Sequence, residues 1–202
     1  MEFRARRAAL LLVDLQRAFC SEDGSVARQG RDVSSCLAAA RRALTLAPAA
    51  RQAGLPVIWT RLCYRADYAD GGLLVHELRP ALKELGALRD GSADAELLPE
   101  ADVHPEDLVI AKQRYSAFHG TLLASLLLAR DVDTLLVAGV TTSMCVESTV
   151  RDAAQRDYRC FVVADACGDF AAERHAASLQ AMAFGFAVVL DTARALDAIR
   201  SA

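Results

Sequence analysis

Cys145 stands where an apolar run, residues 135–138, changes into a segment of helical period through the sequence GVTTSM. A thiol in the first turn of a helix lies near unpaired backbone N–H groups and the positive end of the helix dipole. This environment lowers a cysteine pKa and supplies donors for an anion, so it suits a nucleophile. The alternative is that Cys145 is one of six ordinary buried cysteines, which are mostly inert.

Two other ionisable residues follow apolar runs: Asp14 after residues 10–13 and Lys112 after residues 108–111. A carboxylate beside a thiol can act as its base, and a nearby ammonium can hold the thiolate. Each residue also has a plain structural interpretation, because Asp14 could cap a turn and Lys112 could be solvated. Their occurrence with Cys145 at equivalent strand ends favours a catalytic cluster.

Apolar runs that alternate with helical segments would position these residues. The expected strands are residues 8–13, 56–60, 108–111, 134–138, 160–164 and 186–190, and the expected helices are residues 33–52, 121–130, 143–157, 171–184 and 192–201. Continuous apolar runs indicate strands that are covered on both faces. The pattern therefore predicts an α/β fold with a mainly parallel sheet between helices, and ligands bind such sheets at the carboxyl ends of the strands.

Residues 63–105 interrupt this alternation, and we expect only a short helix within them, around residues 79–85. Long connections in compact domains are often functional. We therefore expect this excursion, residues 63–105, to wall a pocket or to contact a second subunit.

Composition narrows the class of protein. The chain has 202 residues, 53% of them hydrophobic, and a length of this size favours one domain, residues 1–202. The net charge of −3 leaves no basic field for a nucleic acid partner. The apolar run at residues 8–13 is too short for a secretory signal or a bilayer span, so we expect a soluble cytoplasmic protein with no membrane partner. The six cysteines lack C-x-x-C spacing, which favours reduced thiols.

Three stretches resemble the isochorismatase-like cysteine hydrolases: LVDLQ at residues 12–16, KQRYSAF at residues 112–118 and GVTTSMCVESTVRDA at residues 139–153. The similarity runs from about residue 8 to residue 191, and the third stretch is the most specific. The resemblance implies a Rossmann-like three-layer α/β/α fold with a six-stranded, mainly parallel sheet. It also implies a triad of Asp14, Lys112 and Cys145 and assembly into a homodimer or homotetramer.

The resemblance further implies a cis peptide bond between Val140 and Thr141. The backbone N–H groups of Thr141 and Cys145 would then face the oxyanion of a tetrahedral intermediate.

The presence of the thiol helps to distinguish between the reactions of the family, because isochorismatases proper, which cleave a vinyl ether, generally lack this nucleophile. Cys145 therefore argues for hydrolysis of a C–N bond in a small amide, ureido or N-carbamoyl compound through a covalent acyl-thioester. The KQRYSAF stretch is most similar to the branch that acts on ureidoacrylate, biuret and N-carbamoylsarcosine. Two alternatives stay open: a vinyl-ether hydrolase of the isochorismatase type, and a non-catalytic redox-sensing protein of the same fold.

No metal or other cofactor is expected. Within the family that the chain resembles, nicotinamidases carry a metal site built from an Asp and nearby histidines. Residues 60–65 contain no histidine, and the four histidines of the chain, at positions 76, 104, 119 and 175, are scattered.

Five side chains are candidates for substrate contacts. Arg61 and Arg114 could bind a substrate carboxylate, although a structural ion pair is an alternative for each, and for Arg114 the favoured one. Phe19, Trp59 and Phe118 could line a small apolar pocket, or could simply pack in the core. Separately, Ser143 stands where many members of the family carry Asn, and either residue can cap a helix start.

Overall fold

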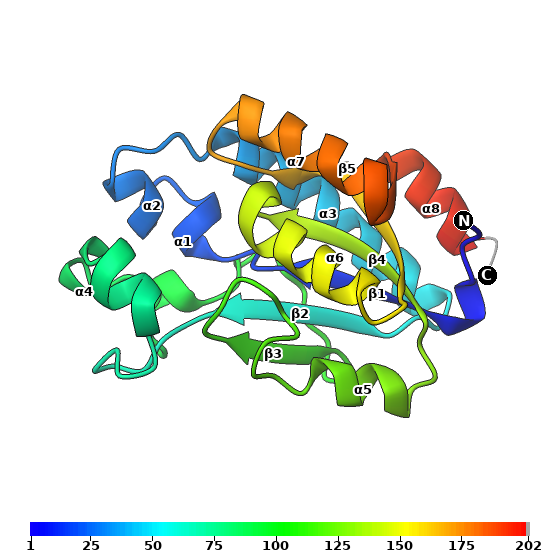
Figure 1. The fold of residues 1–202 in the computed structure, drawn as a ribbon, viewed down its shortest axis with the longest axis horizontal. Coiled ribbons are helices and arrows are strands. Elements are labelled where there is room, and N and C mark those ends of the chain that lie inside the picture. Colours follow the sequence, from blue (N-terminus) through cyan, green and yellow to red (C-terminus); the bar gives the residue numbers. More distant parts are fainter. Residues whose placement is uncertain (201–202) are drawn as a thin grey trace.

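The computed structural model describes residues 1–200. Its sheet has six strands in the order β3-β2-β1-β4-β5-β6, and every neighbouring pair is parallel (Figure 1). The strands are β1 (Ala8–Val13), β2 (Val57–Leu62), β3 (Leu108–Lys112), β4 (Thr134–Val140), β5 (Arg159–Gly168) and β6 (Ala187–Leu190). This doubly wound arrangement confirms the expected Rossmann-like α/β class.

One strand is much longer than the apolar run predicted. Strand β5 continues beyond residue 164 because its pairing with β4 resumes after an irregularity, with Gly139 opposite Cys167 and Val140 opposite Gly168. The exposed Asp165 interrupts the apolar run at this point, so the pattern could not show the continuation.

Helices cover both faces of the sheet. Helices α3 (Ser34–Gln52) and α8 (Thr192–Arg200) pack on one face, and α5 (Leu123–Ala129), α6 (Glu147–Ala154) and α7 (Ala172–Gly185) pack on the other. Of the expected helix 192–201, residue 201 lies outside the described residues. Within residues 1–200, no helix combines the length and the apolar character needed to cross a bilayer.

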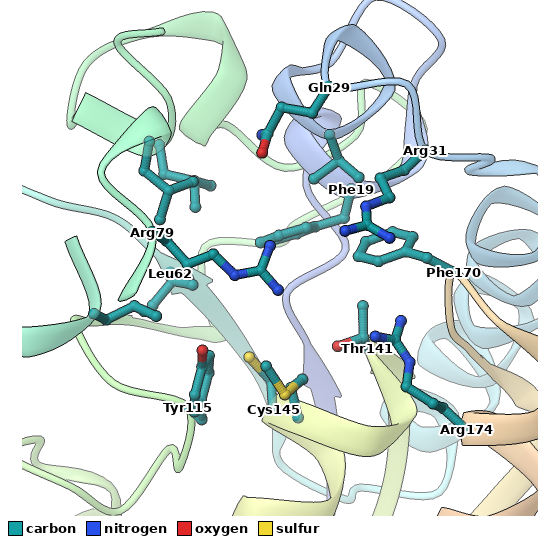
Figure 2. A pocket seen from close by; sticks show the side chains of 15 residues that line it. Phe19, Gln29, Arg31, Leu62, Arg79, Tyr115, Thr141, Cys145, Phe170 and Arg174 are labelled. Atoms are coloured by element: carbon teal, nitrogen blue, oxygen red, sulfur yellow. The ribbon is translucent and has the colours of Figure 1, made fainter. Parts of the chain in front are cut away.

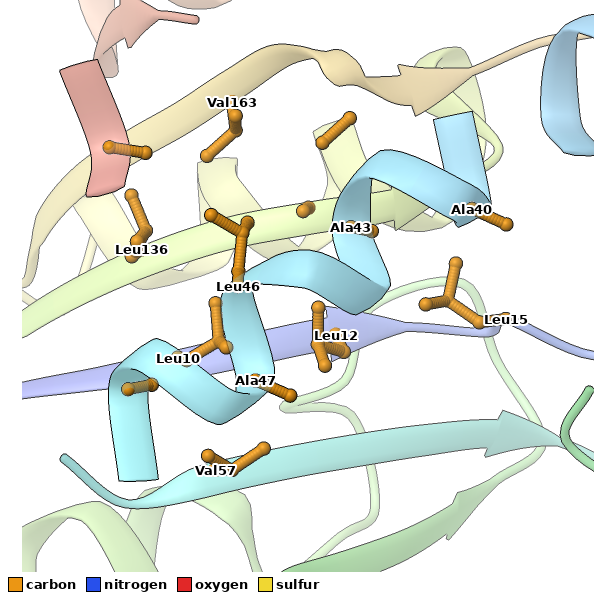
Figure 3. Packing of buried hydrophobic residues seen from close by; sticks show 14 of the residues in the cluster. Leu10, Leu12, Leu15, Ala40, Ala43, Leu46, Ala47, Val57, Leu136 and Val163 are labelled. Atoms are coloured by element: carbon orange, nitrogen blue, oxygen red, sulfur yellow. The ribbon is translucent and has the colours of Figure 1, made fainter. Parts of the chain in front are cut away.

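The alternation of side chains along β1 joins both layers to the sheet. Leu10 and Leu12 face α3, whereas Leu11 packs with the helices of the other face, and all three are fully buried. Small residues on α3, such as Ala43 and Ala47, let this helix lie close against the strands (Figure 3). Because both faces of β1 are buried, the end of this central strand is held firmly.

Short elements surround the carboxyl ends of the strands, on the left of Figure 1. Helices α1 (Arg17–Cys20) and α2 (Ser25–Arg28) follow β1, and each is too short to show a helical period in the sequence. The excursion contains a π-helical turn η2 (Leu74–Leu78), α4 (Ala81–Glu84) and a 3₁₀ turn η3 (Ala93–Ala95), so the helix expected at residues 79–85 is shorter. A further 3₁₀ turn, η1 (Ala5–Arg7), precedes β1.

The excursion has a small hydrophobic cluster of its own. Tyr64, Tyr68, Val75 and Leu88 are buried together, and Ala18 of α1 packs with them. The excursion is therefore anchored beside α1, at the end of the sheet where ligands bind in this class of fold.

The helix expected at residues 143–157 is divided in two. A π-helical turn, η4 (Thr142–Val146), follows β4 and leads into α6. Just before it, Gly139 has φ of 133°, and a Cβ at this position would lie 2.1 Å from the Val13 carbonyl oxygen. Only glycine allows this approach, which brings the end of β1 against the corner after β4.

Candidate active site

Asp14 directly follows β1 and is fully buried. Its backbone has φ of 51°, a left-handed conformation that Asp and Asn adopt more readily than most residues. Its N–H donates to the Thr60 carbonyl at 3.2 Å, and its Oδ1 accepts a hydrogen bond from Thr60 Oγ1 at 2.6 Å. The neighbouring strand β2 thus fixes both the backbone and the carboxylate.

Lys112 is the last residue of β3 and reaches across β2, with which β3 is paired, to the end of β1. Its Nζ lies 2.7 Å from Asp14 Oδ2 and 3.3 Å from Cys145 Sγ, and it donates to the Arg114 carbonyl at 3.1 Å. Burial lowers the pKa of this lysine, but Asp14 and Cys145 outweigh burial and raise the pKa overall. Lys112 is therefore an ammonium that touches both other members of the cluster.

Cys145 lies in η4 with 3% of its surface exposed. Burial raises the pKa of its thiol, Asp14 raises it further, and Lys112 opposes them only in part. The expectation that a helix start lowers this pKa was wrong, because desolvation and a facing carboxylate outweigh the helix dipole. The resting group is therefore a thiol beside a carboxylate that can accept its proton.

Three polar residues of the family-like stretches, Ser116, Thr149 and Asp152, connect the loop after β3 to α6 and to the turn that carries Cys145. Ser116 Oγ donates to Asp152 Oδ2, and the Ala117 N–H donates to Thr149 Oγ1 at 3.0 Å. Thr149 Oγ1 in turn donates to the carbonyl of Cys145 at 2.6 Å. These bonds explain why polar residues stand at these positions, although none of them touches the thiol.

A pocket opens above Cys145 (Figure 2). Its apolar lining comes from α1, α2, the end of β2, the excursion and the segments after β4 and β5, and consists of Phe19, Val26, Leu62, Leu74, Leu82, Leu88, Met144 and Phe170. Its polar lining consists of Gln29, Arg31, Arg79, Tyr115, Thr141, Cys145 and Arg174. The excursion thus forms a wall of the pocket, which is one of the two roles expected for it.

Of the three expected aromatic contacts, Phe19 lies in the pocket lining and the other two do not. Trp59 is fully buried in the core, and its Nε1 donates to Asp107 Oδ2 at 2.8 Å. Phe118 is buried against Tyr158, with ring centroids 5.7 Å apart. For Trp59 and Phe118, the alternative of plain core packing is correct, because each ring faces a helix-covered side of the sheet.

Neither expected arginine lines the pocket. Arg61 pairs with Glu96 at 2.7 Å and with Asp90 at 3.8 Å. Arg114 donates to the backbone carbonyls of Asp70 at 2.9 Å and Gln113 at 2.8 Å. Both guanidinium groups tie the excursion to the sheet, so the structural interpretation applies, although Arg114 binds carbonyl groups and not an acidic side chain.

Sequence reasoning missed the polar residues that do line the pocket, chiefly Arg31, Arg79, Tyr115 and Arg174. Tyr115 belongs to the KQRYSAF stretch and could have been proposed from it. Arg31 lies in the loop between α2 and α3 and Arg79 at the end of η2, whereas Arg174 lies in α7, within the helix expected at residues 171–184. No sequence pattern separates them from the other arginines of the chain.

Ser143 has a supporting role. Its N–H and Oγ both donate to Asp169 Oδ2, at 2.9 and 2.7 Å, while Asp169 Oδ1 accepts from Arg174 at 2.7 Å. Burial alone would raise the pKa of Asp169, but the bonds from Ser143 and Arg174 lower it overall. The expectation that Ser143 itself caps the helix start was wrong, because the Asp169 carboxylate accepts the Ser143 N–H and so plays the part of the cap, while Ser143 Oγ helps to hold this carboxylate.

Metal ligands do not gather at this site. Within residues 1–200, no group of three or more His, Cys, Asp and Glu side chains is placed to hold a metal ion. His175 has its Nδ1 2.8 Å from Oγ1 of Thr142, a residue of η4. All six cysteines are free thiols.

Comparison with known proteins identifies the family. A model of the isochorismatase domain matches residues 8–194. The chain belongs to the isochorismatase family. Among curated members, the ureidoacrylate amidohydrolase RutB of Methylorubrum extorquens strain AM1 is 35% identical over 176 residues, which are 81% of this chain and 71% of that protein. The RutB protein of Methylobacterium radiotolerans is 36% identical over 196 residues, which are 91% of this chain and 76% of that protein.

Solved structures of similar proteins agree with the fold. A cysteine hydrolase from Pseudomonas syringae pv. phaseolicola superposes with a TM-score of 0.91 at 31% identity, covering 100% of this chain and 96% of that one. The N-carbamoylsarcosine amidase of Thermoplasma acidophilum has a TM-score of 0.72 at 24% identity, covering 92% and 96% of the two chains, and supports the fold alone. The protein is thus an isochorismatase-family hydrolase.

Proposed function

We propose that the protein is a cysteine amidohydrolase that cleaves a C–N bond of a small amide, ureido or N-carbamoyl compound. One observation carries this proposal: Lys112 contacts both Asp14 and Cys145 beneath a pocket that Cys145 lines. A nucleophile, a base and a fixed positive charge are then within reach of one bound carbonyl group. The similarity to ureidoacrylate amidohydrolases supports the same class of reaction.

In the first half of the reaction, Asp14 accepts the thiol proton as Cys145 Sγ attacks the carbonyl carbon. The carbonyl π electrons move to oxygen and form a tetrahedral intermediate. When this intermediate collapses, the C–N bond breaks and Asp14 gives its proton to the departing nitrogen. The products are a free amine and an acyl-thioester or carbamoyl-thioester on Cys145.

In the second half, Asp14 takes a proton from water as the water oxygen attacks the thioester carbon. The C–S bond breaks, and the proton held by Asp14 returns to sulfur. Lys112 stays protonated throughout, because it keeps contact with the carboxylate and the sulfur, and its charge stabilises whichever of them is anionic.

The oxyanion of both tetrahedral intermediates needs hydrogen-bond donors. We assign this role to the backbone N–H groups of Thr141, which directly precedes η4, and of Cys145, which lies within η4; both residues line the pocket. Loss of one such donor typically costs about 3 kcal/mol of transition-state stabilisation.

The two alternative functions fit the site less well. Oxidation sensors use exposed thiols of low pKa, whereas Cys145 is 3% exposed and its pKa is raised. A vinyl-ether hydrolase would have no use for a thiol held between a carboxylate and an ammonium. The expected homodimer or homotetramer stays a prediction.

The proposal is tested by offering the wild-type protein and Cys145→Ala a panel of small amides and ureides while released ammonia or amine is measured. Cys145→Ala should lose on the order of 10⁴-fold in kcat, because its nucleophile is missing. Intact-mass spectrometry during wild-type turnover should detect an acyl or carbamoyl group on Cys145.

Cys160→Ala is the matched control, because Cys160 is equally buried and lies at the start of β5, away from the pocket lining. This variant should retain wild-type activity. Full turnover by Cys145→Ala, or the absence of hydrolysis of every compound by the wild-type protein, would refute the proposed function.

A further inference from the structure

The pocket above Cys145 is lined by positive but not by negative side chains. Three arginines, Arg31, Arg79 and Arg174, line it, and no Asp or Glu of the described chain does. Most of the remaining lining is apolar. A positive charge at an apolar surface attracts an anion more strongly than it does in bulk water, because less solvent screens it.

The three arginines are not equivalent. Arg174 is paired with the carboxylate of Asp169, at 2.7 Å. Neither Arg31 nor Arg79 has an acidic side chain within ion-pairing distance among residues 1–200. Two guanidinium groups therefore remain available to a ligand.

Arg79 is the one of these two that is directed at the reaction centre. Figure 2 shows its guanidinium extending into the pocket, opposite Arg174 and above Cys145 and Tyr115. Burial raises the pKa of Tyr115, and the nearby Cys145 raises it further, whereas Arg79 lowers it. The positive charge of Arg79 therefore acts on a residue that is itself close to the thiol. Arg31 stands on the other side of the pocket, near Phe170.

Resting on the proposed function, we propose that the substrate is a ureido or N-carbamoyl acid and that Arg79 is the residue that selects its carboxylate. A guanidinium binds a carboxylate through two parallel hydrogen bonds, which fix orientation as well as charge. With the carboxylate on Arg79, the carbamoyl group reaches Cys145, and the carbon chain between them packs on Leu62 and Phe19. Arg31 adds positive charge at the opposite wall.

Arg174 does not share this role. Its pairing with Asp169 leaves a nearly neutral unit, and Asp169 is held in turn by Ser143. A substrate carboxylate on that side would meet the Asp169 carboxylate, and like charges repel. The asymmetry of the pocket therefore sets the direction in which the substrate enters.

The test compares ureidoacetate, 3-ureidopropionate and 4-ureidobutyrate with their uncharged primary amides, which match them in length. The wild-type protein should prefer at least one acid over its amide by about 10- to 100-fold in kcat/KM, as expected for a charge-assisted pair. Arg79→Ala should remove this preference through a rise in KM for the acid, while hydrolysis of the amide changes by less than about threefold. Arg79→Lys should restore part of it.

Lys83→Ala is the matched control, because Lys83 is an exposed cation of the same excursion that does not line the pocket. It should leave the preference for the acid unchanged. If Lys83→Ala and Arg79→Ala had equal effects, the overall positive charge of the excursion would explain the preference, and the assignment to Arg79 would be overturned.

A binding measurement separates this proposal from the proposed function. In Cys145→Ala, which holds the substrate without turnover, calorimetry should show that the acid binds more tightly than its amide, and that adding Arg79→Ala removes the difference. Equal binding of acid and amide would overturn the role of Arg79, even if the protein hydrolyses both. Preserved charge selectivity in a protein that hydrolyses none of the compounds would support Arg79 and reject the amidohydrolase.

Discussion

The rim of the sheet and the excursion contribute to the same pocket in opposite ways. At the rim, Asp14, Lys112 and Cys145 are almost completely buried and contact one another. In the excursion, Leu74 and Leu82 are half-buried and Arg79 is exposed, all on short turns, and only Leu88 of its pocket residues is buried. The sheet therefore positions the proposed catalytic residues, whereas the excursion determines which molecules reach them.

The two regions also differ in how freely a residue can change. Asp14 is bonded to Thr60 and Lys112 at once, so replacing any of these residues leaves a buried polar group without its partner. The excursion is tied down by its own small cluster and by bonds such as that from Tyr68 Oη to the Ala87 carbonyl, at 2.7 Å. A side chain that faces the pocket from the excursion can therefore be replaced at little cost to the fold.

The largest effect should come from Asp14→Asn, which keeps the shape and tolerates the left-handed backbone but cannot accept the thiol proton. We expect kcat to fall by 10²- to 10⁴-fold, as for the loss of a general base. Because the variant also leaves the buried Lys112 without its counterion, unfolding free energy should drop by about 3 kcal/mol. Steady-state assays and urea denaturation measure the two effects.

Lys112→Met provides the second arm of this test, since it removes the ammonium and keeps an unbranched side chain. Alone it should destabilise by a similar amount, about 3 kcal/mol, by leaving the Asp14 carboxylate unpaired. The double variant should be more stable than the sum of the two losses predicts, yet remain inactive. Strict additivity would show that the rim residues are independent, which would break the comparison.

An intermediate effect is expected from Leu82→Ala in the excursion. Removing part of the apolar wall should weaken substrate binding by about 1 kcal/mol, which corresponds to about a fivefold rise in KM. Because the chemical groups are untouched, kcat should change little, and steady-state kinetics separate the two constants. Leu128→Ala on α5, where the leucine is 79% exposed, is the control and should alter neither constant. A large loss of kcat in Leu82→Ala would contradict the division of roles.

The smallest effect on activity is expected at Asp107, which lies between the excursion and β3. Burial alone would raise the pKa of Asp107, but hydrogen bonds from Arg51, Trp59 and the His104 N–H lower it overall from 3.8. The folded state then binds fewer protons than the unfolded state, so this stabilisation is present above about pH 4 and is lost as the pH falls through the folded pKa.

Asp107→Asn should therefore lower stability by about 1–2 kcal/mol at pH 7 and reduce the loss of stability below pH 4. Urea denaturation from pH 3 to pH 7 measures this change. Activity at pH 7 should stay close to that of the wild type, because Asp107 is remote from the pocket lining. A slope below pH 4 equal to that of the wild type would show that another carboxylate dominates.

The strands of the sheet could be predicted because their sequences are continuous apolar runs. Runs such as residues 8–13 are apolar at every position, which indicates burial on both faces, and the structure gives β1 these same bounds. The ends of these strands predict that Asp14, Lys112 and Cys145 lie on one rim, and in the structure Lys112 contacts both of the others. The family-like stretch around Cys145 further implied the cis peptide bond between Val140 and Thr141, which the structure contains.

The substrate contacts could not be predicted in the same way. Arg61 and Arg79 have the same side chain, and only tertiary structure pairs the first with Glu96 and directs the second into the pocket. Likewise, the pKa of Cys145 depends on desolvation and on Asp14, neither of which the local sequence reveals. Helix α1, with four residues, was also too short to show a period.

Lys112 lies two strands away from Asp14, and this limits the insertions and deletions that the protein can tolerate. Lys112 meets its partners only because β3 pairs with β2 so that Leu62 lies opposite it. Successive side chains of a strand point to opposite faces, so deleting a single residue from β3 would turn the ammonium toward the wrong helical layer. The alignment of this edge strand is therefore as strict a requirement for turnover as the identity of the lysine, and insertions should be tolerated only in the segments on either side of it.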